Sequence, residues 1–260
     1  MERMTLKRCF IDSWGMALNA VVSRPVEVAG LFAILYVVNF IELTFWTAAL
    51  GTLPQSPAHH WHTFATSVHG VVTTAIVLFL TRKVMFANYV MDPHSGLLRA
   101  YWRICGAWFL IGLGCGVALI AVDFAELVPL VVLKAPRALW VFLIVVSNVA
   151  VVAYVFMRLS LLNFHVMLGG AWHWGAAWRD TRGYFWRIFF SHLVTVFPFV
   201  ALALLVGGLL PHADLFGGPD VRSFVVPLLQ TLIGVPTLLI MSACSFWIYQ
   251  RLARGLIASS

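Results

Sequence analysis

Charged residues are scarce in this chain, and their scarcity sets its class. Asp, Glu, Lys and Arg together make up 10% of the 260 residues, whereas hydrophobic residues make up 62%. Soluble globular domains carry about 25% charged residues, so the composition excludes an ordinary soluble domain. The apolar residues gather in six stretches, and a transmembrane helix needs about 20 of them in succession. The sequence therefore predicts an all-α, polytopic membrane protein with six transmembrane helices in a single membrane domain, 1–260.

Compact catalytic and metal-binding motifs are also missing. The chain has no His-Glu-x-x-His run and no Cys-x-x-Cys run, and its four cysteines have no paired spacing. Gly112, Gly114 and Gly116 do not form a nucleotide-binding loop, because such a loop would need a strand before it. They favour close helix packing instead. The N-terminal segment lacks the continuous apolar core of a cleavable signal, so insertion through the helices is expected. We expect no catalytic residue and no cofactor, and the sequence favours a protein that is not an enzyme.

The positive charges are distributed unevenly. Fourteen of the 17 Lys and Arg residues fall in alternate polar segments between the apolar stretches. Cytoplasmic loops of membrane proteins carry such an excess, so both termini are predicted to be cytoplasmic, in a bacterial inner membrane. Topology then accounts for the net charge of +7, which we do not interpret as affinity for nucleic acid. The lipid bilayer and its anionic lipids are the expected partners, since they attract basic segments beside membrane helices.

An amphipathic helix is predicted to precede the first span. Within residues 5–20, Leu6, Phe10, Trp14 and Leu18 recur every four residues. A helix with such an apolar stripe lies in the membrane interface. The six spans are expected at 26–50, 64–80, 104–128, 138–157, 185–210 and 224–249.

An internal repeat with a shift of 76 residues relates two parts of the chain. The shift pairs Arg82 with Arg158 and Trp102 with Trp178, and each Trp is followed by an Arg. In each copy an Arg ends one span and a Trp-Arg pair opens an interfacial helix. With a weaker copy around Trp14, the sequence predicts three units, each with one amphipathic interfacial helix and two spans. Chance matches in a biased composition are the alternative.

Two neighbouring segments resemble a known family. The first, Tyr-Val-Phe-Met-Arg-Leu-Ser, covers residues 154–160, and the second, Ala-Trp-Arg-Asp-Thr-Arg-Gly-Tyr-Phe-Trp-Arg-Ile-Phe, covers residues 177–189. They are similar to the bacterial six-span family that includes the membrane domain of glycerophosphoryl diester phosphodiesterases and the YciC-like proteins. The resemblance implies a six-span fold. It implies no catalytic residue, because the chemistry of the fused phosphodiesterases belongs to a separate soluble barrel domain.

The second segment also carries a cluster of aromatic and basic residues. Aromatic side chains anchor helices at the membrane interface, and Arg side chains beside them face headgroups or the cytoplasm. Gly183 permits a bend where the interfacial helix turns into the next span. Such a cluster can bind anionic lipid headgroups or a protein partner on the cytoplasmic face, and the alternative is membrane anchoring alone. The candidate contacts in the two copies are Trp102, Arg103, Trp178, Arg179, Arg182, Trp186 and Arg187.

Ionisable and amide side chains inside the predicted spans are candidate functional groups, because such groups are rare in a bilayer and mark ligand or ion pathways. They lie in the outer half of the spans or near mid-membrane, so a helix bundle can bring them around one polar cavity. The alternative is that the carboxylates reach water separately. The cavity candidates are Glu42, His69, Asp123, Glu126 and Asn148, and Asn39 is a further intramembrane amide.

Four histidines near the second span are weak metal candidates, namely His59, His60, His62 and His69. Imidazoles beside carboxylates are suitable ligands for zinc or another divalent ion. The alternative is an outer turn whose histidines lie at the level of the headgroups. The identity of any metal stays unknown at this point.

Three classes of function are open. The sequence favours a non-enzymatic inner-membrane protein that scaffolds, docks a partner or interacts with lipid. The alternative is a transporter of a small molecule or ion, supported by the repeat and by Pro227 and Pro236 in the sixth span, since broken helices form binding sites in some transporters. A membrane-embedded metal or haem enzyme rests on the histidines alone. A single cavity shared by Glu42, His69 and Asp123 would favour the second and third classes.

Overall fold

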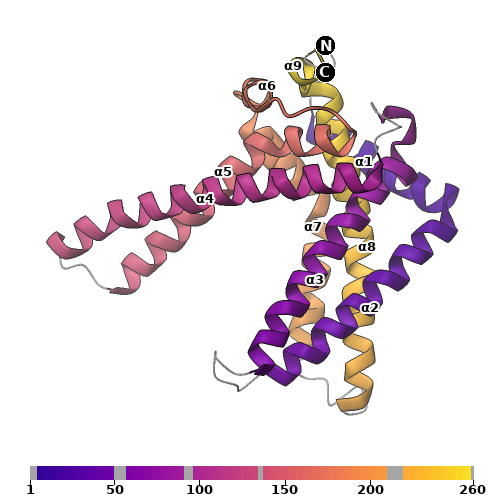
Figure 1. Ribbon diagram of the computed structural model, residues 1–260, viewed down its shortest axis with the longest axis horizontal. Helices are drawn as coiled ribbons and strands as arrows, with labels where there is room; N and C mark the ends of the chain where they lie inside the picture. The colour runs from indigo at the N-terminus through magenta and orange to yellow at the C-terminus, as the bar shows by residue number, and fades with distance from the viewer. Residues whose placement is uncertain (1–4, 50–56, 91–95, 134–136, 210–218, 259–260) are drawn as a thin grey trace. The chain divides into compact units, whose positions relative to one another are not determined.

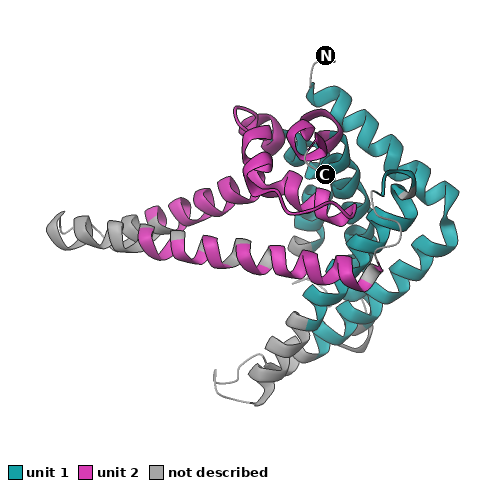
Figure 2. Cartoon of the chain, turned by 45° about the horizontal axis from the view of Figure 1, so that its top comes forward, with its two compact units in different colours: residues 1–90, 190–247 teal, residues 91–189, 248–260 magenta. Residues whose placement is uncertain are grey.

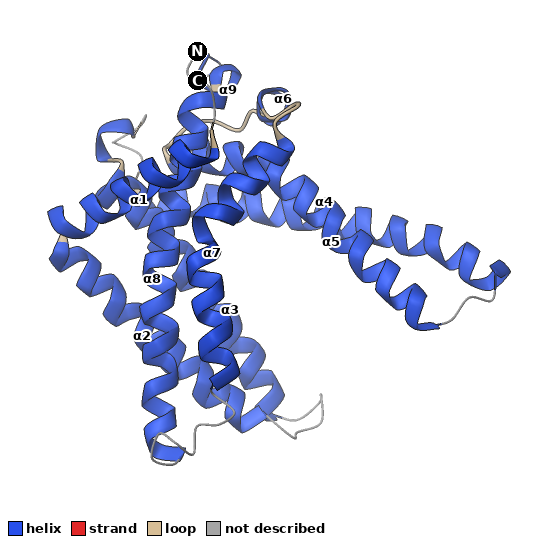
Figure 3. Ribbon diagram, turned by 180° about the vertical axis from the view of Figure 1, so that it is seen from behind, coloured by secondary structure: helices blue, strands red, loops and turns tan. Residues whose placement is uncertain are grey.

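The computed structural model describes residues 5–49, 57–90, 96–133, 137–209 and 219–258. Within these ranges the regular structure is helical and no strand is present (Figure 3), so the prediction of an all-α chain is confirmed there. The α-helices in Figure 1 are α1 (Leu6–Ser23), α2 (Pro25–Ala49), α3 (Pro57–Phe79), α4 (Leu97–Leu133), α5 (Arg137–Met167), α6 (Trp174–Asp180), α7 (Phe185–Leu209), α8 (Pro219–Leu252) and α9 (Arg254–Ala258). After α3 come a π-helical turn, η1 (Leu80–Met85), and a 3-10 turn, η2 (Ala87–Tyr89).

Among the helices that the structure describes, five are long and apolar enough to cross a membrane. Such helices are what a multi-pass membrane protein requires. The third predicted span, 104–128, lies within α4, where several side chains are outside the described part of the chain, so its passage through a membrane stays a prediction. The five apolar segments are Pro25–Thr44, Val68–Met85, Val145–Met167, Phe185–Val206 and Phe224–Leu252.

The chain forms two compact units (Figure 2). Unit 1 comprises residues 1–90 and 190–247, and it contains α1, α2, α3 and most of α7 and α8. Unit 2 comprises residues 91–189 and 248–260, and it contains α4, α5, α6 and α9. The division interrupts α7 and α8, so each of these two helices contributes residues to both units.

The core of unit 1 is an apolar cluster to which α1, α2, α3, η1 and α8 contribute. Its positions recur at the three- and four-residue spacing that places side chains on one face of a helix. Leu35 belongs both to this core and to the wall of the cavity described below. The buried members are Ala17, Ala20, Leu31, Leu35, Ile76, Leu80, Val84, Val235, Leu239 and Ile240.

The amphipathic helix predicted at 5–20 forms α1. Leu6 and Leu18 of its apolar stripe are exposed, which suits a helix that lies against lipid. Small side chains form the face that is buried in the protein, and they let neighbouring helices approach closely. That face consists of Cys9, Ser13, Ala17 and Ala20.

Aromatic contacts hold α1 against the rest of unit 1. The ring of Trp14 stacks on Phe199 of α7 with centroids 5.4 Å apart, and its indole nitrogen donates a 3.3 Å hydrogen bond to the carbonyl of Thr195. From α8, the indole nitrogen of Trp247 donates a 2.7 Å hydrogen bond to Asp12. Because these indole N–H groups have partners, the rings can be buried at little polar cost. Helix α1 is therefore anchored to α7 and α8.

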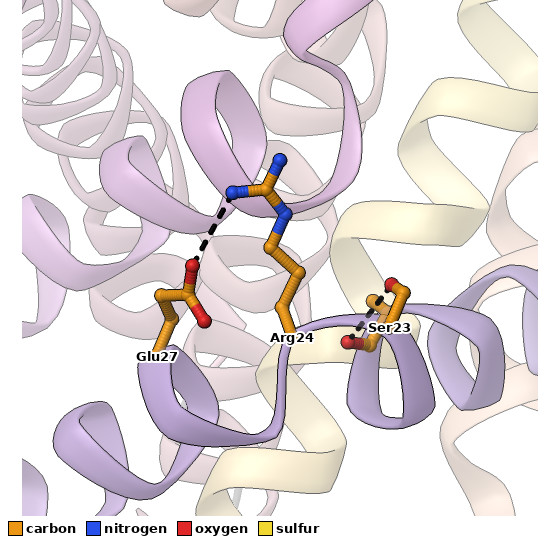
Figure 4. A network of polar contacts seen from close by, with 4 residues as sticks. Ser23, Arg24 and Glu27 are labelled. Carbon is orange, nitrogen blue, oxygen red and sulfur yellow. Dashed lines mark hydrogen bonds and ion pairs between the residues drawn. The ribbon is translucent and has the colours of Figure 1, made fainter.

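The junction between α1 and α2 lies at Ser23 and Arg24 (Figure 4), and the proline that follows explains it. Pro25 disfavours helical backbone at the residue before it and is itself suited to the first position of a helix. Arg24 accordingly leaves the helical region with φ −137°, and α2 starts at Pro25. The guanidinium of Arg24 then contacts Glu27 at 3.2 Å. The pair is exposed, so its role is local and its energy small.

The two best-matched copies of the proposed repeat differ in backbone. In the second copy, α6 and α7 are separated by a turn at Gly183, whose φ is +79°. A shift of 76 residues places Ala107 at the equivalent position, and Ala107 lies within the continuous helix α4. Trp102 therefore lies in α4 and not in a separate interfacial helix, and Gly106, the glycine next to Ala107, keeps helical backbone. The repeat stays a prediction.

The left-handed turn at Gly183 can be tested by substitution. Gly183→Ala should destabilise the protein by about 1–2 kcal/mol, because an L-residue with φ near +79° is strained. Gly175→Ala is the matched control. Gly175 lies in α6 with nothing near its position for a Cβ, so Ala should be neutral or stabilising there. Thermal unfolding of the purified protein in detergent measures both, and equal melting temperatures would contradict the assigned turn.

Candidate functional site

A cavity of about 720 Å³ lies within unit 1, between α2, α3, α7 and α8. Ligand sites commonly have volumes of about 300–1,000 Å³, so the cavity has room for a small molecule. Apolar side chains form most of its wall and a few polar ones project among them. The apolar lining is Leu35, Leu43, Ala203, Val206, Val226, Leu229, Ile233, Gly234 and Leu238, and the polar lining is Asn39, Glu42, His69, Thr73, Gln230 and Thr237.

Glu42 of α2 and His69 of α3 form a hydrogen-bonded pair at this cavity, through Glu42 Oε2 and His69 Nδ1. The two residues are 27 positions apart in the sequence, and they meet because α2 and α3 pack against each other. Their side chains remain 29% and 30% exposed, so a molecule in the cavity can reach both. The structure thus brings together two of the residues that the sequence selected as cavity candidates.

The other predicted candidates are not placed beside this pair. Asn148 is a half-buried residue of α5 in unit 2 and does not line the cavity. Five side chains lie outside the described part of the chain, namely Asp123, Glu126, His59, His60 and His62. Among the side chains that are described, no three His, Cys, Asp or Glu groups gather to hold a metal ion. The convergence of the predicted acids on one cavity stays a prediction. The binding of a metal by the histidines stays a prediction as well.

Three polar residues of the cavity, Thr73, Gln230 and Thr237, were not selected from the sequence. Thr73 follows His69 by four residues, a spacing that places both on one face of α3. The hydroxyl of Thr73 is buried without a hydrogen-bond partner in the described residues, which costs about 1–3 kcal/mol unless water or a ligand satisfies it. Gln230 of α8 is exposed and lines the cavity. The only signal for Gln230 is that it is an amide inside an apolar span.

Asn39 has a structural role at the edge of the same cavity. Its amide nitrogen donates a 3.0 Å hydrogen bond to the hydroxyl of Thr231, and that hydroxyl donates a 2.7 Å hydrogen bond to the carbonyl of Pro227. Both side chains are buried. The chain of two bonds joins α2 to α8 and satisfies polar groups that lipid could not satisfy.

The stretch of α8 that lines the cavity contains helix-breaking residues, as the sequence predicted. Pro236 cannot donate a backbone hydrogen bond to the helix, and the hydroxyl of the next residue, Thr237, donates a 2.6 Å bond to the carbonyl of Ile233. A Cβ at Gly234 would lie 3.3 Å from the side chain of Leu35. The glycine therefore allows α2 and α8 to approach closely beside the cavity.

The predicted lipid-contact residues form a second candidate site in unit 2, which we call the collar. All seven side chains are exposed, including Trp102 at 66% and Trp186 at 65%. Exposed indoles beside exposed guanidiniums are the combination that anchors a helix at the headgroup level of a membrane. The collar consists of Trp102, Arg103, Trp178, Arg179, Arg182, Trp186 and Arg187.

Arg158 contacts the turn between α6 and α7, around which five of the seven collar residues lie. The hydroxyl of Thr181 donates a 3.1 Å hydrogen bond to the carbonyl of Arg158, which ties α6 to α5. The guanidinium carbon of Arg158 lies 4.4 Å from the ring centroid of Trp178, within the range of a cation–π contact. The segment that resembles the six-span family is therefore a local structural unit.

Asp180 provides a further tie that sequence reasoning missed. Its carboxylate accepts hydrogen bonds of 3.1 and 3.0 Å from the backbone N–H groups of Gly255 and Leu256. These are unpaired donors at the start of α9, so Asp180 acts as a cap from another helix. A Cβ at Gly255 would come within 2.8 Å of the carboxylate, which explains the glycine.

The bond between Asn39 and Thr231 can be tested with a double-mutant cycle. Thr231→Val should cost more than Asn39→Leu, because it leaves a buried amide unsatisfied, about 1–3 kcal/mol. The double variant should be less destabilised than the sum of the two single variants. Thr74→Val is the control, since the hydroxyl of Thr74 bonds only within its own helix. Strict additivity in thermal unfolding would show that the two side chains are not coupled.

Comparison of the chain with protein-family models, with curated proteins and with solved structures found no match. The resemblance of residues 154–189 to the six-span family stays a prediction that rests on those two segments. The function must therefore be inferred from the cavity of unit 1 and the collar of unit 2.

Proposed function

We propose that this chain is a multi-pass protein of the bacterial cytoplasmic membrane, with both termini in the cytoplasm, that binds a small polar or charged molecule in the cavity of unit 1 and carries it across the membrane. One observation carries the proposal: Glu42 and His69 are paired at the wall of a cavity between apolar helices. Ionisable residues in membrane helices that face a cavity mark substrate and ion pathways.

The composition of the cavity wall supports this function over scaffolding alone. A protein that only organises lipid or partners needs no carboxylate inside its helix bundle. Transporters place their sites beside interrupted helices, where polar groups are available to a substrate. Helix α8 is continuous from Pro219 to Leu252 and is not interrupted, but it carries Pro236 within the stretch that lines the cavity, close to Gly234. The alternating basic segments support the orientation of the termini.

Water access to the cavity tests the proposal. Gln230→Cys, in membrane vesicles, should react with a membrane-impermeant thiosulfonate from at least one side. The matched control is Leu204→Cys, because Leu204 is 72% exposed but lies outside the cavity lining. A thiol facing lipid stays protonated and unreactive, so Gln230→Cys should react at least about tenfold faster.

The native cysteines set the background of this experiment, and the unsubstituted protein measures it. Vesicles of both orientations report which side opens to the cavity. If Gln230→Cys reacts no faster than Leu204→Cys from either side, the cavity is closed to water and the transport proposal fails.

Binding of anionic lipid is a second candidate function, and the exposure of all seven collar side chains favours it. Five of the seven collar residues place guanidiniums and indoles around the turn from α6 to α7, and Trp102 and Arg103 lie in α4. In this role the protein would scaffold the membrane or dock a cytoplasmic partner, as the sequence favours. The two functions use different residues and are compatible in one molecule.

The collar can be tested through the lipids that the purified protein retains. Arg182→Gln should weaken binding of phosphatidylglycerol about fivefold, since one basic residue near an anionic surface contributes about 1 kcal/mol. Arg254→Gln is the control, because Arg254 is an exposed cation of α9 outside the collar. Native mass spectrometry counts the bound lipids. Equal losses in the two variants would show a general charge effect and no collar site.

A further inference from the structure

We infer that the cavity of unit 1 takes an amphipathic primary ammonium ion, a molecule with one positive charge on an NH₃⁺ group and an apolar body. This inference rests on the proposed function and adds the chemical class of the ligand. Three features of the wall specify that class: its charge, its apolar surface and one unsatisfied hydroxyl. The evidence for each is given in turn.

The charge of the wall selects a cation. Glu42 is the only acid and His69 the only base among the described residues that line the cavity. The parts of α7 and α8 that line it contribute no titratable group, and no Lys or Arg is present in the lining. An anion would therefore meet the carboxylate of Glu42 without a fixed positive charge to offset the repulsion. A cation can replace His69 as the partner of that carboxylate.

The apolar surface selects an organic cation over an inorganic one. Calcium needs six to eight oxygen ligands, magnesium keeps an octahedral shell, and structural zinc sites use four protein ligands. The pair supplies one carboxylate and one imidazole, surrounded by leucine, valine and isoleucine side chains. That surface is satisfied by the apolar body of a ligand, which gains free energy when it leaves water.

The hydroxyl of Thr73 selects an ammonium ion that still carries N–H groups. Its oxygen is buried without a hydrogen-bond partner among the described residues, and Thr73 lies one helical turn from His69 on the cavity wall. An NH₃⁺ group has three donors. It can place one on Glu42 and, once the Thr73 side chain turns to bring its buried hydroxyl into the cavity, another on Thr73. A quaternary ammonium ion has no N–H group and can make neither bond.

The inference is tested by equilibrium binding of three probes to the full chain in lipid nanodiscs, with empty nanodiscs as background. The probes are 2-phenylethylammonium, its N-trimethylated analogue, and 3-phenylpropionate, which has a similar shape and the opposite charge. The primary ammonium ion should bind most tightly and phenylpropionate should not bind. Binding of phenylpropionate as tightly as the ammonium ion, or displacement of the ammonium ion by Zn²⁺, would overturn the inference.

Two variants assign the binding to the named side chains. Glu42→Gln should weaken binding of 2-phenylethylammonium at least about tenfold, as expected for loss of a charge-assisted contact. Thr73→Val should weaken binding of the primary ammonium ion and leave binding of the trimethylated ion as it was. The matched control is Glu27→Gln, which removes a carboxylate from the same helix at its exposed pair with Arg24 (Figure 4) and should leave binding unchanged.

Failure of the inference can be told apart from failure of the proposed function. If Gln230→Cys is labelled and 2-phenylethylammonium does not bind, the cavity is open to water and only the ligand class is wrong. If Gln230→Cys is not labelled, the transport function itself fails. Thermal unfolding checks that Glu42→Gln is folded. Should it be unfolded, the comparison of Thr73→Val with the unsubstituted protein decides, since equal weakening of both ammonium probes would overturn the inference.

Discussion

The contact between Glu42 and His69 is the interaction on which the cavity of unit 1 depends. A carboxylate inside a bundle of apolar helices loses its hydration, and after relaxation the loss is still several kcal/mol per ion. Two circumstances reduce that cost here. The imidazole supplies a hydrogen bond, and each side chain keeps nearly a third of its surface exposed. The two side chains keep part of their hydration through the cavity beside them. Because they also bond each other, α2 and α3 can pack closely at this point.

The part of α8 beside the cavity contains hydroxyl groups that form hydrogen bonds within the helix itself. Prolines deprive a helix of backbone hydrogen bonds, and in a membrane no water replaces them. The hydroxyls of Thr231 and Thr237 each donate to the carbonyl four residues earlier, a pattern that tends to bend helices. Thr231 also accepts a bond from Asn39. The same hydroxyl thus bonds within the proline-containing stretch of α8 and links that stretch to α2.

The sequence was sufficient for the helices and for part of the site. Long apolar runs predicted the helical segments, and the rarity of ionisable groups in such runs singled out Glu42 and His69. Thr73 could not be predicted from the sequence, because the hydroxyl of a threonine in an apolar helix can bond a carbonyl of that helix. Thr74 does so through the carbonyl of Gly70. Only packing decides which of the two threonines lines a cavity. Likewise, repeat matching could not show that Ala107 keeps α4 continuous where Gly183 ends a turn.

The contacts within the segment that resembles the six-span family hold its helices and turn together. Arg158 is buried, its guanidinium lies over Trp178, and its Nε has no hydrogen-bond partner among the described residues. Its carbonyl receives the hydroxyl of Thr181. These contacts set the path of the chain from α5 through α6 into α7, and so decide which side chains of the collar are exposed. A motif of this kind can recur in proteins with different activities, because what it specifies is the turn that presents the basic and aromatic side chains. The residues of the proposed ligand site belong to the other unit.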